Sequence, residues 1–175
     1  ATNIIAEGEV QQLINTHDAS LSEAGYLHVI RSKTAKLFEA STQIAAILAN
    51  ANPEQEAASV TYGQALGTAF QIIDDVLDYD GDAAEMGKNL GDDLREGKCT
   101  LPLIIAMQRG TAEQAAVIRE AIEQGSTDKL PEILAIVRST GALDATRQAA
   151  HNEAMRAMQA LDALPKVRGQ EGNIN

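Results

Sequence analysis

Cysteine, histidine and aromatic residues are all scarce in this sequence, and their scarcity excludes several kinds of site. The single cysteine, Cys99, cannot form an intrachain disulfide and is compatible with a reducing compartment. The three histidines, His17, His28 and His151, lie far apart and share no spacing typical of zinc ligands. We therefore expect neither a disulfide framework nor a zinc site, and we interpret Cys99 as a bystander thiol and the histidines as structural or surface residues.

Positive charge is also in short supply. The 14 lysines and arginines stand against 25 aspartates and glutamates, which gives a formal net charge of -11 at pH 7. Nucleic-acid binding draws on clustered lysine and arginine side chains that displace counterions from phosphates. We therefore expect no nucleic-acid partner, and an anionic substrate would need a bound metal ion.

Long hydrophobic runs are absent as well. No stretch approaches the roughly 18 uninterrupted apolar residues of a membrane span, and no basic segment precedes an apolar one at the N-terminus. We therefore expect a cytoplasmic protein without a membrane span. The sequence starts at Ala1 and enters a helical pattern at once, without a capping residue, which is typical of a chain entered in the middle of its fold.

The residues that are abundant favour helices. Ala, Leu, Ile, Glu, Gln and Met dominate, whereas aromatics make up only 3%. Straight-chain and small side chains lose little rotamer freedom in a helix. With 175 residues, 45% of them hydrophobic, the chain is large enough to bury a core. The predicted fold class is all-α.

Capping and helix-breaking residues divide the sequence into predicted helices. Ser20 and Glu23 have the spacing of a capping box, and Asn52 with Pro53 marks a break followed by a favourable first turn. The polar, glycine-punctuated segment 81–97 is long for a simple connection, and such segments are more often functional or mobile. The predicted helices cover 4–15, 20–48, 53–80, a helix from 100, 111–124, 126–140 and 143–164.

The long helix 53–80 has two special features. Gly63 and Gly67 keep its middle thin, so that a neighbouring helix or a ligand can approach closely. Its apolar residues recur every three or four positions, which is typical of a face that packs on a core. The predicted core face consists of Tyr62, Leu66, Ala69, Phe70, Ile73 and Leu77.

An acidic cluster lies near the end of the same helix. Asp74, Asp75 and Asp78, with Gln71 one turn earlier, project from one face, opposite the apolar one. Three like charges beside a helix C-terminus repel one another and the helix dipole, which indicates a compensating cation. Carboxylate oxygens spaced to leave room for water and phosphate suit Mg²⁺. A solvated acidic face is the alternative.

The segment that follows supports the metal interpretation. It brings two lysines, Lys88 and Lys98, and further carboxylates beside the same helix end, as expected for a polyanion bridged through a metal ion. A calcium loop starting at Asp78 is excluded, because its sixth and twelfth positions hold Ala83 and Asn89 instead of glycine and glutamate.

Several segments together resemble one enzyme family. They are Phe70-Gln71-Ile72-Ile73-Asp74-Asp75-Val76-Leu77-Asp78, Gly87-Lys88, Gly91-Asp92-Asp93-Leu94, Ser32-Lys33-Thr34-Ala35, Ala6-Glu7-Gly8-Glu9, Gly97-Lys98 and Thr100-Leu101-Pro102-Leu103. Their order is similar to the second aspartate-rich region and its surroundings in trans-isoprenyl diphosphate synthases, in particular the bacterial octaprenyl type. The resemblance implies that residues 1–165 are the C-terminal part of an isoprenoid-synthase-type helical bundle, with an atypical, disordered tail at 166–175.

The resemblance also implies a chemistry. In that family an allylic diphosphate ionises, and isopentenyl diphosphate attacks the resulting carbocation in a head-to-tail condensation. Mg²⁺ ions stabilise the departing diphosphate. The implied metal ligands are Asp74, Asp75 and Asp78, the implied catalytic residues are Lys33, Gln71 and Lys88, and the implied substrate contacts are Lys33, Thr34, Gln71, Lys88 and Lys98. Taken alone, Lys33 and Thr34 would be interpreted as a helix-surface lysine and a capping or back-bonding threonine.

The sequence also departs from the family pattern. No other Asp-Asp-x-x-Asp occurs in it, and the family's basic site for isopentenyl diphosphate is missing. We therefore expect this chain to be inactive alone. The alternatives are a non-catalytic relative that binds Mg²⁺ and diphosphate or pairs with other chains, and a plain helical interaction protein. Because half of such a bundle leaves apolar surface uncovered, we expect a homo-oligomer, most simply a dimer.

Overall fold

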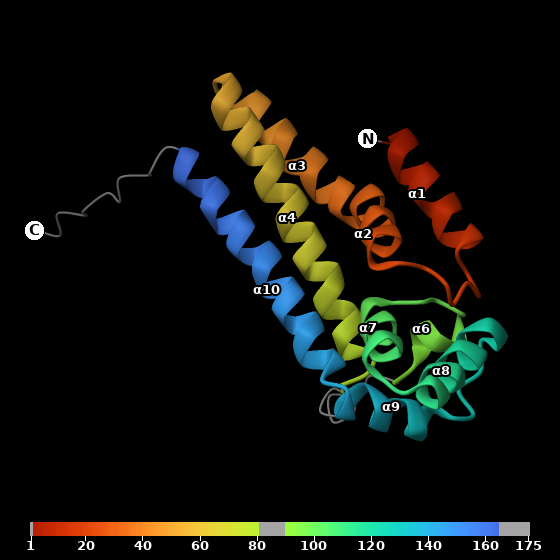
Figure 1. Ribbon diagram of the computed structural model, residues 1–175. Helices are drawn as coiled ribbons and strands as arrows, with labels where there is room; N and C mark the ends of the chain where they lie inside the picture. Colours follow the sequence, from red (N-terminus) through yellow and green to blue (C-terminus); the bar gives the residue numbers. More distant parts are fainter. Residues whose placement is uncertain (1, 81–89, 165–175) are drawn as a thin grey trace, which may run out of the picture.

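The computed structural model describes residues 2–80 and 90–164, and the regular elements of this part of the chain are all helices, without a strand (Figure 1). The all-α prediction is therefore confirmed. The elements are α1 (Thr2–Ile14), α2 (Glu23–Ser32), α3 (Thr34–Leu48), α4 (Pro53–Leu77), α6 (Asp92–Arg95), α7 (Leu101–Arg109), α8 (Ala112–Gln124), α9 (Leu130–Ser139), α10 (Ala142–Ala160) and the 3₁₀ turn η1 (Leu161–Ala163). The tail expected to be disordered, 166–175, lies outside the described residues.

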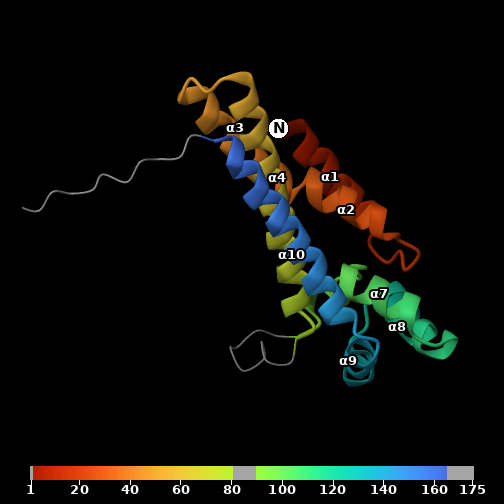
Figure 2. The same ribbon diagram turned by 60° about the vertical axis from the view of Figure 1, so that its left-hand side comes forward.

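Three long helices form a layer, with α4 between α3 and α10 and antiparallel to both (Figure 1). Helices α1 and α2 lie to one side of this layer, and the shorter helices α6 to α9 gather around the C-terminal end of α4 (Figures 1 and 2). A buried apolar cluster lies in that lower region, where α7 packs on α8, α9 and the first turns of α10. Ile72 and Val76 join this cluster, which anchors the end of α4 that bears the aspartates.

The close approach predicted from the glycines of α4 is confirmed. A methyl group at Gly63 would lie 2.7 Å from the carbonyl oxygen of Phe38 and 2.8 Å from Cα of Glu39, both in α3. At Gly67 the nearest atom is Cα of Ala35, at 2.7 Å. The two helices thus touch backbone to backbone, which holds Thr34 at the start of α3 close to the last turns of α4.

Local signals placed the start of one helix correctly and the start of another about half a turn too early. The break at Asn52 and the first-turn position of Pro53 are as predicted, and Asn52 also caps α4 in a full capping box with Gln55. Helix α2, however, is capped by Ser22, whose hydroxyl accepts from the amide of Gly25. Ser20 bonds Asp18 instead, so the predicted capping box of Ser20 was wrong.

The predicted helix 20–48 is broken at Lys33. Its backbone, with φ -99° and ψ -88°, leaves the helical region and separates α2 from α3. No glycine or proline marks this break, which is why the sequence pattern runs through it. The kink turns the Lys33 side chain toward α1, where it meets Glu9 and Gln12.

The predicted core face of α4 was wrong in large part. Phe70 is 59% exposed and Ile73 is 40% exposed, whereas Ile72 and Val76 are almost completely buried. The helix packs mainly on α3 and α10, while Ile72 and Val76 face the lower cluster. Of the predicted core face, Ala69 is buried and Tyr62, Leu66 and Leu77 are half-buried. The predicted end near Asp80 is also late, because α4 ends at Leu77.

Within the described residues, no helix combines the length and the apolar character required to cross a lipid bilayer. The absence of a helical membrane span expected from the sequence agrees with this finding. The cytoplasmic location stays a prediction.

The contact between α3 and α4 yields a stability prediction. Gly63→Ala should lower the free energy of unfolding by roughly 1–2 kcal/mol, because overpacking costs more than the gain of about 1 kcal/mol in helix propensity. Chemical denaturation with urea measures the change. Gly25→Ala is the matched control: a methyl group there meets mainly the flexible end of Leu21, so stability should hold or rise. Equal changes in the free energy of unfolding for the two variants would contradict the close contact between α3 and α4.

Candidate functional site

A pocket of about 260 Å³ lies where the last turns of α4 meet α1, α2 and the start of α3. The segment that runs from α6 to the start of α7 contributes Asp93, Lys98, Cys99 and Thr100 to its lining. Both acidic and basic side chains line it, together with neutral polar and apolar residues of α1 and α2. The charged residues of the lining are Lys33, Asp74, Asp75, Asp93 and Lys98.

The most constrained of these side chains is Asp75, which is only 3% exposed. The hydroxyl of Tyr26, on α2, donates to Asp75 Oδ2 at 2.6 Å, and Gln71 Nε2 donates to Oδ1 at 2.9 Å. The hydroxyl of Thr34 donates in turn to Gln71 Oε1 at 3.0 Å. One chain of hydrogen bonds therefore joins α2, α3 and α4, and it occupies both oxygens of the carboxylate.

Burial decides the protonation of Asp75. Desolvation raises the pKa of its carboxyl to about 7, and the hydrogen bonds from Tyr26 and Gln71 reduce this rise without cancelling it. The nearby carboxylates of Asp93 and Asp74 add to the rise, because each disfavours a further negative charge. Near neutral pH both the protonated and the ionised form are therefore populated, and a cation in the pocket would favour the ionised form.

Asp78 has a different environment from the other two aspartates. Its Oδ1 and Oδ2 accept from the backbone amides of Asp92 and Asp93, at 3.0 and 3.1 Å, and thereby cap the short helix α6. Desolvation, with the charge of Asp93, raises the pKa of Asp78 to about 6. Asp78 does not belong to the residues that line the pocket. It fixes the segment that carries Asp93 against the end of α4.

The two lysines reach the pocket from opposite sides. Lys33 Nζ lies 2.9 Å from a carboxylate oxygen of Glu9 and donates to Gln12 Oε1 at 2.8 Å. Lys98 Nζ lies 3.2 Å from Asp93 Oδ1 and 2.6 Å from Glu96 Oε2. Both ion pairs are partly exposed, so each ammonium group can exchange its partner for a ligand at small cost.

The carboxylate oxygens of the pocket fit an Mg²⁺ ion whose remaining ligands are water and phosphate oxygens. Asp74 is exposed and lies next to the buried Asp75, and Asp93 faces the same pocket from α6. Among the described residues, no three His, Cys, Asp or Glu side chains gather into a closed metal site. Mg²⁺ typically binds one or two carboxylates and completes its shell with water and phosphate oxygens, and this donor set supports that arrangement.

The structure gathers most of the residues singled out in the sequence. Lys33, Thr34, Gln71, Asp74, Asp75 and Lys98 all line the one pocket. Asp78 stands outside the lining, and Lys88 lies outside the described residues. Tyr26 and Asp93 were missed as site residues. Nothing in the sequence around Tyr26 indicates that its hydroxyl reaches a carboxylate 49 positions later, whereas Asp93 was visible as one of several carboxylates that follow α4.

Comparison with known proteins agrees with this geometry. A family model for polyprenyl synthetases matches residues 1–137. The octaprenyl diphosphate synthase of Escherichia coli K12 is 53% identical over 175 residues, which cover 99% of this chain and 54% of that protein. An all-trans-nonaprenyl-diphosphate synthase of Rhodobacter capsulatus is 48% identical over 98% of this chain and 52% of its own length. The chain thus spans about half the length of the curated relatives it matches.

Solved structures show the same relation. The crystal structure of a decaprenyl diphosphate synthase from Rhodobacter capsulatus superposes with a TM-score of 0.87 at 44% identity, over 94% of this chain and 51% of that one. A polyprenyl synthase from Caulobacter crescentus, crystallised with calcium and isoprenyl diphosphate, gives a TM-score of 0.85 at 42% identity, over 93% and 50%. The resemblance found in the sequence and the partial helical bundle that it implied are confirmed.

The buried carboxyl of Asp75 yields a prediction on pH. An acid whose pKa is higher in the folded protein than in the unfolded chain stabilises the fold while it is protonated, and this contribution is lost as pH rises through the folded pKa. In the absence of divalent ions, the free energy of unfolding should therefore fall between pH 5.5 and 8, a range above the isoelectric point of about 4.6. Asp75→Asn should reduce that fall by more than about 1 kcal/mol.

Urea denaturation at several pH values measures this dependence. Asp162→Asn, at an exposed position of η1, serves as the control and should leave the fall unchanged. Identical pH dependence in the unaltered chain and in Asp75→Asn would show that Asp75 is not protonated in the folded protein.

Proposed function

Because the chain belongs to the polyprenyl synthetase family, we propose that its pocket binds the diphosphate group of a prenyl substrate through Mg²⁺. The observation that carries the proposal is the meeting of Asp74 and Asp93 with Lys33 and Lys98 around one cavity. A metal ion would bind the carboxylates, and a polyanion bound to that metal ion would bind the ammonium groups, so a diphosphate with Mg²⁺ complements both kinds of side chain. A chain with a net charge of -11 would otherwise repel a diphosphate.

Each residue then has a distinct task. Asp74 and Asp93 supply the oxygens that would hold Mg²⁺. Lys33 and Lys98 exchange their present carboxylate partners for phosphate oxygens, as point charges that need no fixed orientation. Lys88, although it lies outside the described residues, is proposed for the same role. When bound, Mg²⁺ would neutralise the charge that develops on a departing diphosphate.

The resemblance implied Asp75 and Asp78 as metal ligands, and we propose that both also position other residues of the site. Asp75 positions Gln71 and the last turn of α4, and its ionised form adds negative charge beside the metal. Asp78 holds α6 so that Asp93 faces the pocket. Gln71 and Thr34, which form one hydrogen-bonded pair at the pocket wall, are proposed to contact the substrate next to its scissile bond.

We further propose that the whole reaction is the condensation of isopentenyl diphosphate with an allylic diphosphate, and that this chain alone binds without condensing. Its sequence contains one Asp-Asp-x-x-Asp motif and spans about half of its relatives. The site for the second substrate and the remaining metal ligands would lie in the half that it does not span.

Self-association is proposed through apolar side chains that the fold leaves exposed. Leu13 and Ile14 on α1 are 72% and 67% exposed, and Leu48 at the end of α3 is 79% exposed. Groups of such residues usually mark contact surfaces. Light scattering on the purified chain should therefore give the mass of a dimer or a larger species, whereas a stable monomer at micromolar concentration would contradict this proposal.

Calorimetric titration with inorganic diphosphate tests the proposed pocket. We expect binding in the presence of Mg²⁺ and at least tenfold weaker binding without it, which corresponds to about 1.4 kcal/mol. Asp74→Asn should weaken Mg²⁺-dependent binding by a similar factor, because it removes a hard anionic oxygen from the site. Affinity should also rise from pH 6 to pH 8, since the carboxyl of Asp75 ionises in that range and metal binding favours ionised neighbours.

Asp144→Asn, at an exposed position of α10, is the matched control and should leave affinity unchanged. Binding that is indifferent both to Mg²⁺ and to Asp74 would contradict the proposal. An extension assay with labelled isopentenyl diphosphate and an allylic primer then separates a competent synthase from a chain that only binds.

A further inference from the structure

His17 stands at a junction of three segments. It belongs to the turn between α1 and α2, and this turn reaches both the segment between α6 and α7 and the C-terminal end of α8 (Figure 1). The backbone of His17 has φ 65°, a left-handed conformation that histidine, asparagine and aspartate adopt more readily than most other residues. Its amide donates to the carbonyl oxygen of Gly97 at 2.8 Å, which joins the turn to the segment after α6.

The imidazole ring of His17 joins the third segment. Nδ1 lies 3.0 Å from the carbonyl oxygen of Ile122, in the last turn of α8. Because a carbonyl oxygen only accepts hydrogen bonds, Nδ1 carries the proton and donates. Carbonyl groups in the last turn of a helix lack their regular α-helical partner, and the helix dipole favours a donor there. The side chain of His17 therefore ties the end of α8 to the turn after α1.

Two glycines leave room for this ring. A methyl group at Gly97 would overlap Cε1 and Nδ1 of His17, and one at Gly125 would lie 3.0 Å from Cε1. Both glycines have positive φ, 71° and 60°, so an L side chain would also be strained at either position. The ring of His17 is thus packed on Gly97 and Gly125, although part of the residue is exposed to solvent.

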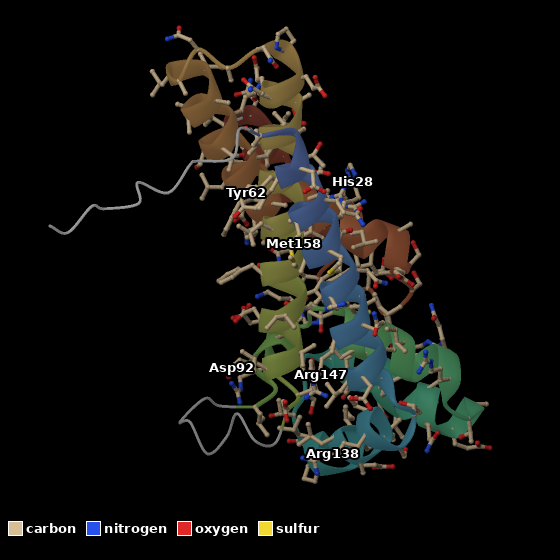
Figure 3. All side chains as sticks on the ribbon, turned by 90° about the vertical axis from the view of Figure 1, so that its left-hand side faces the viewer. His28, Tyr62, Asp92, Arg138, Arg147 and Met158 are labelled. Carbon is tan, nitrogen blue, oxygen red and sulfur yellow. The ribbon has the colours of Figure 1, made fainter. Side chains whose placement is uncertain are left out.

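Gly97 leads directly into the pocket. The next residue, Lys98, lines the pocket, and its amide donates to the carbonyl oxygen of Asp93 at 2.9 Å. Figure 3 shows where this segment starts, because Asp92, the first residue of α6, is labelled beside the C-terminal end of α4. A glycine has more backbone freedom than any other residue, so the chain just before Lys98 needs an external contact to fix it. His17 provides that contact.

We propose that His17 is a positioning residue of the diphosphate pocket, which fixes Gly97 and thereby the ammonium group of Lys98. His17 does not line the pocket, whereas Thr16 and Lys98 on either side of the contact do. It therefore acts on a bound phosphate only through Lys98. This inference rests on the proposed function, because the position of Lys98 affects binding only if the pocket takes a diphosphate.

Calorimetric titration of the full chain with inorganic diphosphate and Mg²⁺ tests the inference. His17→Gly retains access to the left-handed backbone but removes the ring, and it should weaken binding about fivefold or more, as expected for the loss of one hydrogen bond. His17→Asn should stay within about twofold of the unaltered chain. Asparagine accepts the same backbone, and its side-chain amide can donate to Ile122 in place of Nδ1.

A double-mutant cycle separates positioning from a general loss of stability. Lys98→Met should weaken binding about fivefold or more in the unaltered chain and less than about twofold in His17→Gly, where the ammonium group is already out of place. His151→Gly is the matched control. It places a glycine within α10, at an exposed position outside the pocket lining, and so lowers stability while affinity stays unchanged.

Circular dichroism melts show whether each variant is folded. Should His17→Gly not fold, His17→Asp takes its place, because aspartate tolerates the left-handed backbone but its carboxylate cannot donate to Ile122. Unchanged affinity in these variants, a loss that His17→Asn also shows, or full additivity with Lys98→Met would overturn the inference and leave the proposed function intact. Failure of the unaltered chain to bind diphosphate with Mg²⁺ would refute the proposed function and the inference together.

Discussion

The buried carboxylate of Asp75 is the constraint on which the rest of the site depends. Removing an ionised carboxylate from water costs several kcal/mol unless its oxygens are hydrogen-bonded. Tyr26 and Gln71 satisfy one oxygen each, and Thr34 fixes Gln71 in turn. The position of α2 and α3 against α4 therefore depends on the hydrogen bonds of the Asp75 carboxyl. The neighbouring Asp74 is exposed and lines the pocket, so the adjacent pair has one buried member and one member at the pocket surface.

The proposed division of labour would allow an acidic chain to bind an anionic substrate. In this proposal the carboxylates of Asp74 and Asp93 hold a hard cation at one end of the pocket, while Lys33 and Lys98, each now beside an acid, would bind phosphate oxygens. A diphosphate with Mg²⁺ meets complementary groups on both sides, whereas either component alone meets repulsion from one of them. We therefore expect Mg²⁺ and diphosphate to bind cooperatively.

What the sequence could predict follows from the range of the interactions. Local signals were sufficient for the helical class, the break at Asn52 and the thin middle of α4 at Gly63, because they depend on neighbours within a turn or two. Lys33, Thr34 and Lys98 were instead singled out through the family resemblance. Tyr26 was missed because its partner is distant in sequence, and the kink at Lys33 has no local mark. The core face of α4 was misplaced for a different reason: apolar residues lie around much of this helix, so the periodicity does not decide which of them are covered. The described residues cover α4 from α3 and α10 and leave Phe70 and Ile73 exposed.

A crystal structure of the chain grown with Mg²⁺ and inorganic diphosphate would test the central claim most directly. The account predicts a diphosphate in the pocket, with Mg²⁺ between one of its oxygens and the carboxylate of Asp74, and with the ammonium groups of Lys33 and Lys98 turned from their present partners onto phosphate. Diphosphate bound elsewhere, or a pocket in which Asp74 has no metal and both lysines keep their carboxylate partners, would contradict it.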